Sequence, residues 1–299
     1  MKCVSFAFLL ESIRRMKTKA LLFRFSSLLL LALCRFIPAL AQYNGTSQEG
    51  EIGLQAGAAH YFGDLNGRTR LNSPHPTIGI FYRKQINNYT AFRLGVNYLR
   101  LGYSDEMESR NEFQRRRNLN FESSVWELLF QGDFNFFRFN PSEPNARFTP
   151  YLTFGIGFFF YDPYTFLDGQ KYYLRPLGTE GQTSSLYPEK KEYGQTALAI
   201  PFGLGLKWAV GRNINVHFEV THRFTGTDYL DDVSGTYAGI NAFSTGSPAA
   251  LLQDRSYLNG TPIGIAGAQR GFSGNKDQYV TAVFGFTFNL TSYKCPSGQ

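Results

Sequence analysis

The feature that most constrains this 299-residue chain is a two-residue alternation of apolar and polar side chains, repeated along much of its length. Successive side chains of a β-strand point to opposite faces, so such an alternation predicts strands with one apolar and one polar face. In the segment 92–98, one face holds Phe92, Leu94, Val96 and Tyr98, and the other holds Arg93, Gly95 and Asn97.

Eight segments carry this alternation, and no amphipathic helix of convincing length interrupts them. Each is close to the ~9–11 residues of a tilted membrane strand, and an even number of strands is typical of bacterial outer-membrane barrels. We therefore expect an all-β fold, an eight-stranded antiparallel up-and-down transmembrane β-barrel with four long extracellular loops. The segments lie at about 52–58, 78–83, 92–98, 126–136, 152–160, 198–208, 214–221 and 280–289.

The predicted connections alternate between short and long. The short ones lie near Asn87–Asn88 and at 138–149 and 211–213, and the long ones are 63–76, 104–118, 163–195 and 226–276. Outer-membrane barrels have short periplasmic turns and long outer loops. With the N-terminus in the periplasm, all four long connections face outward.

The first 41 residues have the composition of a secretory signal peptide. Lys17 and Lys19 form a charged start, residues 28–33 form an apolar centre, and residues 39–41 form a small-residue cleavage site. We expect a signal peptide at 1–41, with Met16 as an alternative start, then a barrel at 42–290 and a periplasmic tail at 291–299. An uncleaved anchor helix is the alternative, but Arg24 and Arg35 bracket too few apolar residues for the ~20 of a spanning helix.

The charge and the mean hydropathy argue against two classes of protein, those that bind nucleic acid and helical membrane proteins. The chain has 30 Lys and Arg against 23 Asp and Glu, but most of this excess lies in the leader, so the mature chain is nearly neutral and nucleic acid is not an expected partner. Cys3 and Cys34 lie in the leader, which leaves Cys295 without an intramolecular disulfide partner. The mean hydropathy of −0.25 excludes a helical membrane protein, whereas 16% aromatic residues suit a barrel wall in contact with lipid.

A soluble lipocalin-like barrel is the alternative fold, because it also has eight strands. Its apolar face would point inward. Eight strands enclose a space just wide enough for side chains, which leaves little room for so many rings. We therefore favour outer-membrane lipid as the environment of Trp126, Phe130, Phe154, Phe158, Phe160, Phe284 and Phe286.

The polar face of the strands would then line the lumen. In so narrow an interior, charges of both signs are stable only when they are paired and hydrogen-bonded. We therefore expect a closed polar network, which argues against a general diffusion porin. Its predicted members are Arg93, Glu127, Asp133, Lys207, His217 and Glu219.

Four strings of residues carry a family resemblance. They are Tyr61–Asn66 at the end of the first strand, Leu177–Gln182 in the third long loop, Ile200–Gly203 at the start of the sixth strand and Thr227–Gly235 after the seventh. Together and in this order they resemble the outer-membrane barrel subunit of type IX secretion, a PorG-type family often described only as a domain of unknown function. The resemblance covers about residues 50–290. Its motif residues in the loops are Gly63, Asp64, Leu65, Asn66, Gly178, Thr179, Glu180, Gly181, Asp228, Tyr229, Asp231 and Asp232.

The resemblance implies a non-enzymatic component of a protein secretion and gliding apparatus in the cell outer membrane. It implies association with a periplasmic ring, built from a lipoprotein and its partner, and it implies neither catalytic residues nor a cofactor. The alternative is a stand-alone surface barrel for adhesion or small-molecule passage.

The loops also carry residues suited to two kinds of chemistry. Asp228, Asp231 and Asp232, with Glu180 from another loop, could surround a hard cation, which prefers carboxylate oxygens. A loop held by Asx turns and arginines is the alternative for the same residues. An enzyme at the rim could use His222 with Asp228, or His60 with Asp64, but no nucleophile is marked nearby.

Overall fold

The computed structural model describes residues 47–67, 70–108 and 110–292. The predicted signal peptide and most of the predicted periplasmic tail therefore lie outside the described residues. The last strand continues to Ser292, two residues past the predicted end of the barrel.

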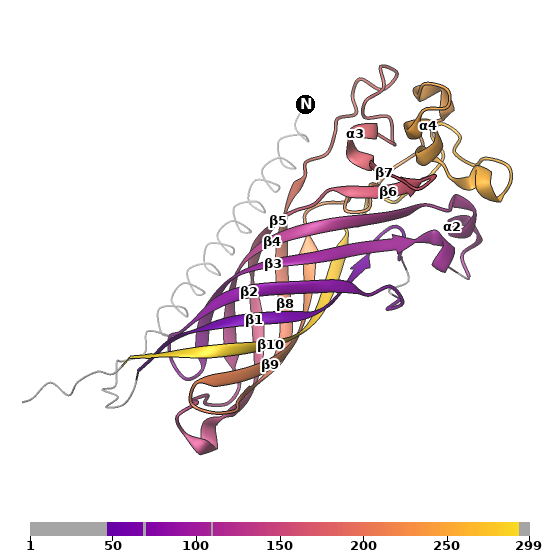
Figure 1. Ribbon diagram of the computed structural model, residues 1–299. Helices are drawn as coiled ribbons and strands as arrows, with labels where there is room; N and C mark the ends of the chain where they lie inside the picture. Colours follow the sequence, from indigo (N-terminus) through magenta and orange to yellow (C-terminus); the bar gives the residue numbers. More distant parts are fainter. Residues whose placement is uncertain (1–46, 68–69, 109, 293–299) are drawn as a thin grey trace, which may run out of the picture. The chain divides into compact units, whose positions relative to one another are not determined.

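Eight long antiparallel strands form a closed barrel (Figure 1). Each strand pairs with the next along the chain, and β10 pairs with β1 to complete the ring. This confirms the predicted fold class. The strands are longer than predicted because they continue past the apolar alternation into the bases of the long loops. Their bounds are β1 Ser47–Phe62, β2 His75–Gln85, β3 Thr90–Ser104, β4 Asn120–Asn135, β5 Phe148–Phe160, β8 Thr196–Ala209, β9 Ile214–Thr225 and β10 Gln278–Ser292.

The connections are short at one end of the barrel and long at the other. The short turns are 86–89, 136–147 and 210–213, and the second contains η2 (Pro144–Ala146). The long loops gather at the opposite end (Figure 1), and we call them the outer cap: residues 63–74, 105–119, 161–195 and 226–277. The cap contains η1 (Asp105–Met107), α2 (Glu112–Arg117), β6 (Pro163–Leu167), β7 (Gln170–Tyr173), α3 (Leu174–Leu177), η3 (Ile240–Ala242), α4 (Pro248–Gln253) and η4 (Ser256–Asn259). None of the helices in the described ranges is long and apolar enough to cross a membrane.

The β6–β7 hairpin was not predicted. Its turn residues Asp168 and Gly169 both have positive φ angles, as a two-residue hairpin turn requires. An Asp-Gly pair is a recognised signal for such a turn. β6 also pairs with the first residues of β4, so the hairpin continues the barrel wall into the cap.

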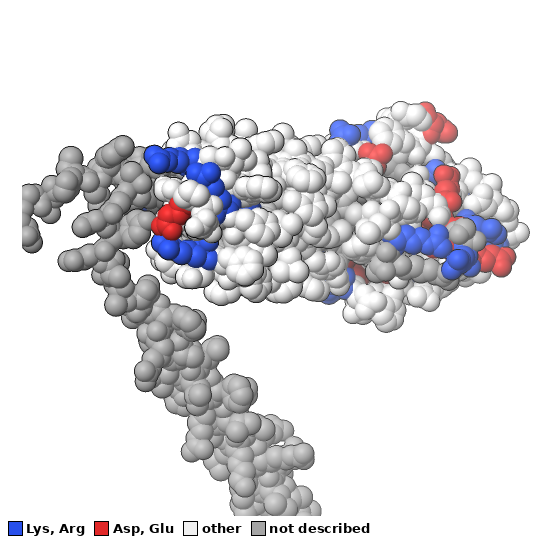
Figure 2. Space-filling view, turned by 90° about the horizontal axis from the view of Figure 1, so that it is seen from below, with Lys and Arg blue, Asp and Glu red and all other residues white. Residues whose placement is uncertain are grey.

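The outward faces of the strands form an apolar belt. Phe158, Phe202 and Phe284 are 62%, 50% and 68% exposed, whereas their neighbours on the inward face are buried. Figure 2 shows a middle zone without charged side chains, with Lys, Arg, Asp and Glu at the two ends. Only lipid accommodates an exposed apolar band of this extent around a closed barrel. The soluble alternative, with its rings inside, is therefore wrong.

The interior is filled by pairing large side chains with glycines. A Cβ atom on Gly53 would lie 2.2 Å from the Phe81 ring, and one on Gly205 would lie 2.4 Å from the Tyr151 ring. Toward the outer cap the interior becomes apolar, with a core that includes Leu99, Leu101, Tyr103, Phe121, Val125, Phe159 and Tyr279. The lumen is therefore polar near the short turns and apolar beneath the cap.

Candidate functional site

The polar half of the lumen contains three ion-paired groups. In the first, Arg83 of β2 lies between two carboxylates from neighbouring parts of the wall. Its Nη1 is 2.9 Å from Glu51 Oε2, and its Nε is 2.7 Å from Asp133 Oδ2. All three side chains are fully buried. The guanidinium therefore bridges two carboxylates that would each be costly to bury without a basic partner.

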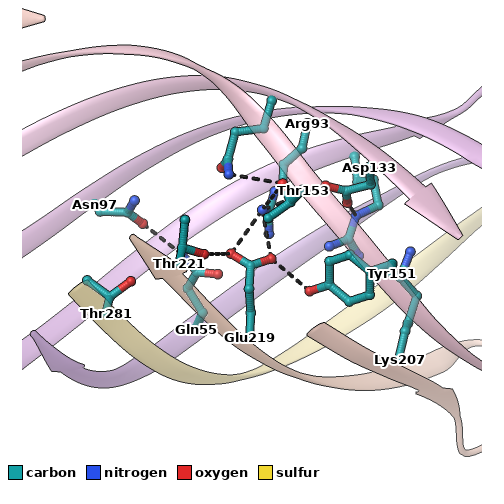
Figure 3. Close-up of polar contacts among 12 residues, drawn as sticks. Gln55, Arg93, Asn97, Asp133, Tyr151, Thr153, Lys207, Glu219, Thr221 and Thr281 are labelled. Carbon is teal, nitrogen blue, oxygen red and sulfur yellow. Dashed lines mark hydrogen bonds and ion pairs between the residues drawn. The ribbon is translucent and has the colours of Figure 1, made fainter. Parts of the chain in front are cut away.

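The second group crosses the lumen (Figure 3). Arg93 of β3 approaches Glu219 of β9, with Nη2 2.8 Å from Oε2. Tyr151 and Thr221 donate hydrogen bonds to the same carboxylate, at 2.7 and 2.8 Å. Arg93 also lies 3.7 Å from Asp133, which connects this group to the first.

The third group lies closer to the apolar core. Arg223 of β9 approaches Glu127 of β4, with Nε 2.8 Å from Oε1. Tyr279 and Asn97 donate to the two oxygens of Glu127, at 2.7 and 2.9 Å. The carboxylate therefore has three donors from three different strands, which ties opposite sides of the wall together.

Lys207 and His217 complete the lumen near the short turns. Lys207 Nζ is 3.4 Å from Asn135 Oδ1 and lies 5.0 Å from the centres of the Tyr151 and Phe139 rings. His217 packs against the Phe81 ring, with 5.4 Å between ring centres. Its ring nitrogens have no hydrogen-bond partner within the described part of the chain.

All six residues predicted to line the lumen are buried inside it. Three of them, Arg93, Asp133 and Glu219, form one connected set with Glu51 and Arg83, and Glu127 pairs with Arg223. Glu51, Arg83 and Arg223 were not among the predicted residues. These three residues lie on the inward face of their strands. The apolar–polar alternation could therefore have predicted that they line the lumen. The buried charged residues of the described strands balance, with four bases and four acids: Arg83, Arg93, Lys207, Arg223, Glu51, Glu127, Asp133 and Glu219.

The outer cap is built on two buried arginines. Arg117, at the end of α2, makes a two-pronged contact with Asp105, at 2.7 and 2.8 Å. It also donates to the backbone carbonyls of Asp64 and Arg270, in two other loops. One guanidinium therefore joins the first, second and fourth loops.

Arg270 is the second of these arginines, and it joins the third loop to the fourth. Its Nη1 is 3.2 Å from Glu180 Oε1 and 2.6 Å from the carbonyl oxygen of Asp232. Glu180 also accepts hydrogen bonds from the backbone of Ser234 and Gly235. These contacts bring together motif residues of the third and fourth loops that are far apart in the sequence.

The remaining motif residues pack around this centre. Leu65 is buried in the apolar core, and Asn66 donates to the carbonyl of Tyr61 at the end of β1 and to that of Arg70 in its own loop. Gly178 and Gly181 have φ angles of 60° and 90°, which other residues rarely adopt. Tyr229 stacks on Tyr193, with ring centres 4.5 Å apart. The motif segment 200–203 lies within β8, not at the start of that strand as predicted.

Two carboxyl groups of the cap share one hydroxyl. Tyr61 Oη lies 2.5 Å from Asp231 Oδ2 and 3.0 Å from Asp277 Oδ1. Burial raises the pKa of both carboxyl groups well above the usual range. The charge of Asp277 raises the pKa of Asp231 further, and the charges of Asp228 and Asp64 raise the pKa of Asp277 further. Burial likewise raises the pKa of Asp228 to about 6. These acids favour their protonated forms more than ordinary surface carboxyl groups do.

The predicted cation ligands do not converge on one point. Glu180 is bound to Arg270, Asp228 accepts from the Ser234 hydroxyl, and Asp232 accepts from Thr179 and Tyr193. Asp231 is occupied by Tyr61 and the backbone of Val233. In the ranges that the structure covers, no cluster of three or more acidic, His or Cys side chains is arranged for a metal. Hydrogen-bond donors already occupy these oxygens, so the geometry favours the alternative of a loop held by hydrogen bonds and arginines.

The two histidines considered for rim catalysis have no acidic partner in the described residues. His222 Nε2 lies 2.7 Å from Gln278 Oε1, and His60 Nδ1 lies 2.9 Å from the Tyr61 carbonyl. Asp64 accepts from the backbone of Phe272 instead of a histidine. Neither predicted His–Asp pair forms, because each histidine and each aspartate is hydrogen-bonded to another group.

Closure, the apolar belt and the asymmetric connections are the features of a bacterial outer-membrane protein. By these features the protein is an outer-membrane β-barrel, as predicted, with its short turns in the periplasm and its cap outside. Its interior is filled by paired side chains and its outer end is covered by loops.

Comparisons with known proteins give one family and several distant structures. A family model described as Domain of unknown function (DUF6089) matches residues 29–247. No curated protein matches the sequence. Neisserial surface protein A is 10% identical with a TM-score of 0.40, and the match covers 83% of this chain and 100% of that one.

Two further solved structures have similar values. Ail, the attachment invasion locus protein of Yersinia pestis, is 11% identical with a TM-score of 0.37, and the match covers 81% of this chain and 99% of that one. The outer membrane protein OprG from Pseudomonas aeruginosa is 11% identical with a TM-score of 0.33, and the match covers 81% and 97%.

Proposed function

The chain belongs to the DUF6089 family, and from that premise we propose that it is a non-enzymatic outer-membrane component of the type IX protein secretion and gliding apparatus. In this role the barrel anchors or docks a periplasmic ring built from a lipoprotein and its partner. The resemblance of its loop motifs to the PorG-type family suggests the role, and the filled interior supports it.

The filled interior is the observation that carries the proposal. Salt bridges cross the lumen from β2 to β4 and from β3 to β9, and the outer cap covers the apolar core above them. A barrel whose interior is filled can bind partners at its surface but offers no channel for solutes. A docking role needs only surfaces, whereas passage of small molecules needs a lumen.

The periplasmic end offers a surface for such docking. A groove beside the β4–β5 turn is lined by exposed aromatic rings and by Arg138 and Arg147. Arg138 is 2.7 Å from Glu143, and its side chain remains 45% exposed. Aromatic residues and arginines are enriched at protein interfaces. The rings that line this groove are Phe137, Phe148 and Trp208.

Crosslinking and pull-down from intact envelopes test the proposal. We expect the tagged chain to recover a periplasmic lipoprotein and its ring partner, and deletion of the gene to abolish export of secreted substrates. Exchange of Arg138 and Arg147 for Glu should reduce recovery of the ring without loss of the folded barrel. Arg212→Glu, on another periplasmic turn, is the matched control. Unchanged export in the deletion strain would end the proposal.

A stand-alone surface barrel for adhesion is the second candidate. The observation in its favour is a set of exposed apolar side chains on the cap, which soluble surfaces rarely gather without a partner. In that case the barrel should purify alone, and cells that lack it should lose attachment while export continues. These cap residues are Leu71, Ile240, Leu258, Ile265 and Phe272.

A further inference from the structure

A small cavity lies at the outer rim, where the ends of β3 and β4 meet the β6–β7 hairpin. Its volume is about 160 Å³, and its lining includes Ser73, His75, Tyr103, Asn120, Glu122 and Phe166. The cavity is separate from the lumen network, and it borders one of the histidines considered for rim catalysis, because the backbone N–H of Ser73 donates to His60 Nε2 at 3.2 Å. Asn120 and Glu122 precede the lipid-facing Trp126 on β4 by ~13–20 Å of strand. The cavity therefore lies on the cap side of the lipid-facing Trp126, toward the outer leaflet.

Gly102 of β3 makes room for this cavity. A Cβ atom at this position would lie 3.1 Å from His75 Nε2 and 3.3 Å from Glu122 Cγ. The opposite wall is held in place by the hairpin, because Tyr164 donates to Glu122 at 2.8 Å and Thr165 donates to Asn120. The walls therefore belong to paired strands and are pre-formed.

The polar groups of the lining suit an uncharged ligand. Glu122 supplies a carboxylate, and no Lys or Arg is among the described lining residues. Asn120 Oδ1 accepts from Arg255 at 2.7 Å, which leaves the amide hydrogens of Asn120 as donors. The carboxylate of Glu122 accepts well from hydroxyl groups.

We propose that this cavity binds a single neutral pyranose unit of a glycan. Glu122 accepts hydrogen bonds from neighbouring sugar hydroxyls, and Asn120 donates to a ring or hydroxyl oxygen. Phe166, 47% exposed at the mouth, offers a ring face to the C–H groups of the sugar. The volume is below the ~300–1,000 Å³ of pockets for drug-sized ligands, which suits one ring.

Binding accounts for this lining better than catalysis does. Ser73 Oγ lies 3.3 Å from His75 Nε2, which resembles a nucleophile and its base. In a catalytic triad a third group orients the histidine, whereas the printed side-chain partner of His75 in the part of the chain described is Ser73 itself. The serine and histidine are therefore assigned as hydrogen-bonding groups for sugar hydroxyls.

Saturation-transfer NMR on the processed protein in lipid nanodiscs tests the assignment. The probes are the methyl glycosides of glucose, galactose, mannose and N-acetylglucosamine. We expect at least one to bind in the millimolar range, and Glu122→Gln and Phe166→Ala each to weaken binding at least about tenfold. Glu189→Gln, an exposed carboxylate elsewhere in the cap, should leave it unchanged. The heat-dependent shift of the folded barrel on gels shows that each variant is folded.

Several outcomes would overturn the assignment. One is the absence of a signal from all four glycosides, and another is equal binding by Glu122→Gln and Glu189→Gln. Stronger binding of inorganic phosphate than of any glycoside would also reject it. So would hydrolysis of a p-nitrophenyl ester that Ser73→Ala abolishes, because the cavity would then be catalytic.

A competition arm distinguishes the source of the sugar. If rough-type lipopolysaccharide in the nanodisc displaces the methyl glycoside, the ligand is a glycolipid of the same leaflet. If only a soluble oligosaccharide displaces it, the ligand comes from outside the cell. Either result supports a pyranose site.

Discussion

At the scale of single residues, the barrel depends on buried charges that cannot be removed one at a time. Arg223 and Glu127 lie 96 positions apart in the sequence and contact each other at 2.8 Å inside the lumen. Loss of one partner leaves the other charged and buried, which is far more costly than the loss of an exposed ion pair.

We therefore expect Arg223→Met to lower the free energy of unfolding by about 3–5 kcal/mol, because Glu127 would remain buried without its base. Urea titration of the barrel in lipid vesicles measures this change. The double variant Arg223→Met with Glu127→Gln should recover part of the loss, since the neutral side-chain amide can still accept from Tyr279. Arg212→Met, on an exposed turn, is the control. Equal losses in the single and double variants would contradict the expectation.

The two carboxyl groups beside Tyr61 make the cap sensitive to pH. The pKa of Asp277 is raised in the folded state, whereas an unfolded Asp titrates near 3.9. Between these values the folded state holds a proton that the unfolded state lacks. Stability of the cap therefore falls as pH rises from about 4 through the raised pKa.

Asp277→Asn should remove much of this dependence. We expect the variant to stabilise the cap at pH 8 by on the order of 1 kcal/mol or more, and to have little effect near pH 4. Hydrogen exchange of residues 226–277 at pH 4.5, 6 and 8 measures it. The control Glu189→Gln should keep the slope of the native protein. A native cap that gains protection as pH rises would refute the assigned direction.

At the scale of elements, each strand is defined by which of its faces meets lipid. Phe284, near the middle of β10, is flanked across the ladder by Ala56 and Phe218 on the same outward face. A lysine there would place a charge in the hydrocarbon layer. The cost falls from the middle of the membrane toward the interfaces.

Phe284→Lys should therefore destabilise the barrel by about 2–4 kcal/mol in vesicles. Phe272→Lys is the matched control, because that ring is exposed on the cap and not on the belt. Urea unfolding of both variants measures the difference. Similar stabilities of the two variants would mean that β10 does not face lipid.

The elements were not all equally visible in the sequence. The eight long strands could be predicted because their alternation is a local property that each segment carries by itself. The β6–β7 hairpin was missed although Asp168 and Gly169 marked its turn. Its strands are short and do not alternate over enough residues to outweigh a loop assignment.

At the scale of the whole molecule, the balanced lumen predicts a barrel without a stable conducting pore. Arg83 and Arg93 both approach Asp133, so the cross-lumen groups form one connected set. Opening a path would require separation of several buried ion pairs at once. The outer cap adds a second closure above the apolar core.

In planar bilayers we expect the purified protein to give no porin-like conductance steps. A variant without residues 236–272 should also remain closed, because the lumen network lies below the cap. A general porin reconstituted in the same way is the positive control. Regular steps from the native protein would contradict the filled-lumen description and would favour the passage alternative.

The sequence by itself determined the strand number, the direction of each face and the position of long and short connections. These follow from alternation between neighbouring residues and from turn signals, which are local. The tertiary structure determined which charged residues form ion pairs. Arg93 pairs with Glu219, and Glu180 pairs with Arg270. The tertiary structure also decided that the interior is polar only near the periplasm. Those outcomes depend on the stagger of the closed ring and on contacts among four loops, which bring together residues that no local pattern relates.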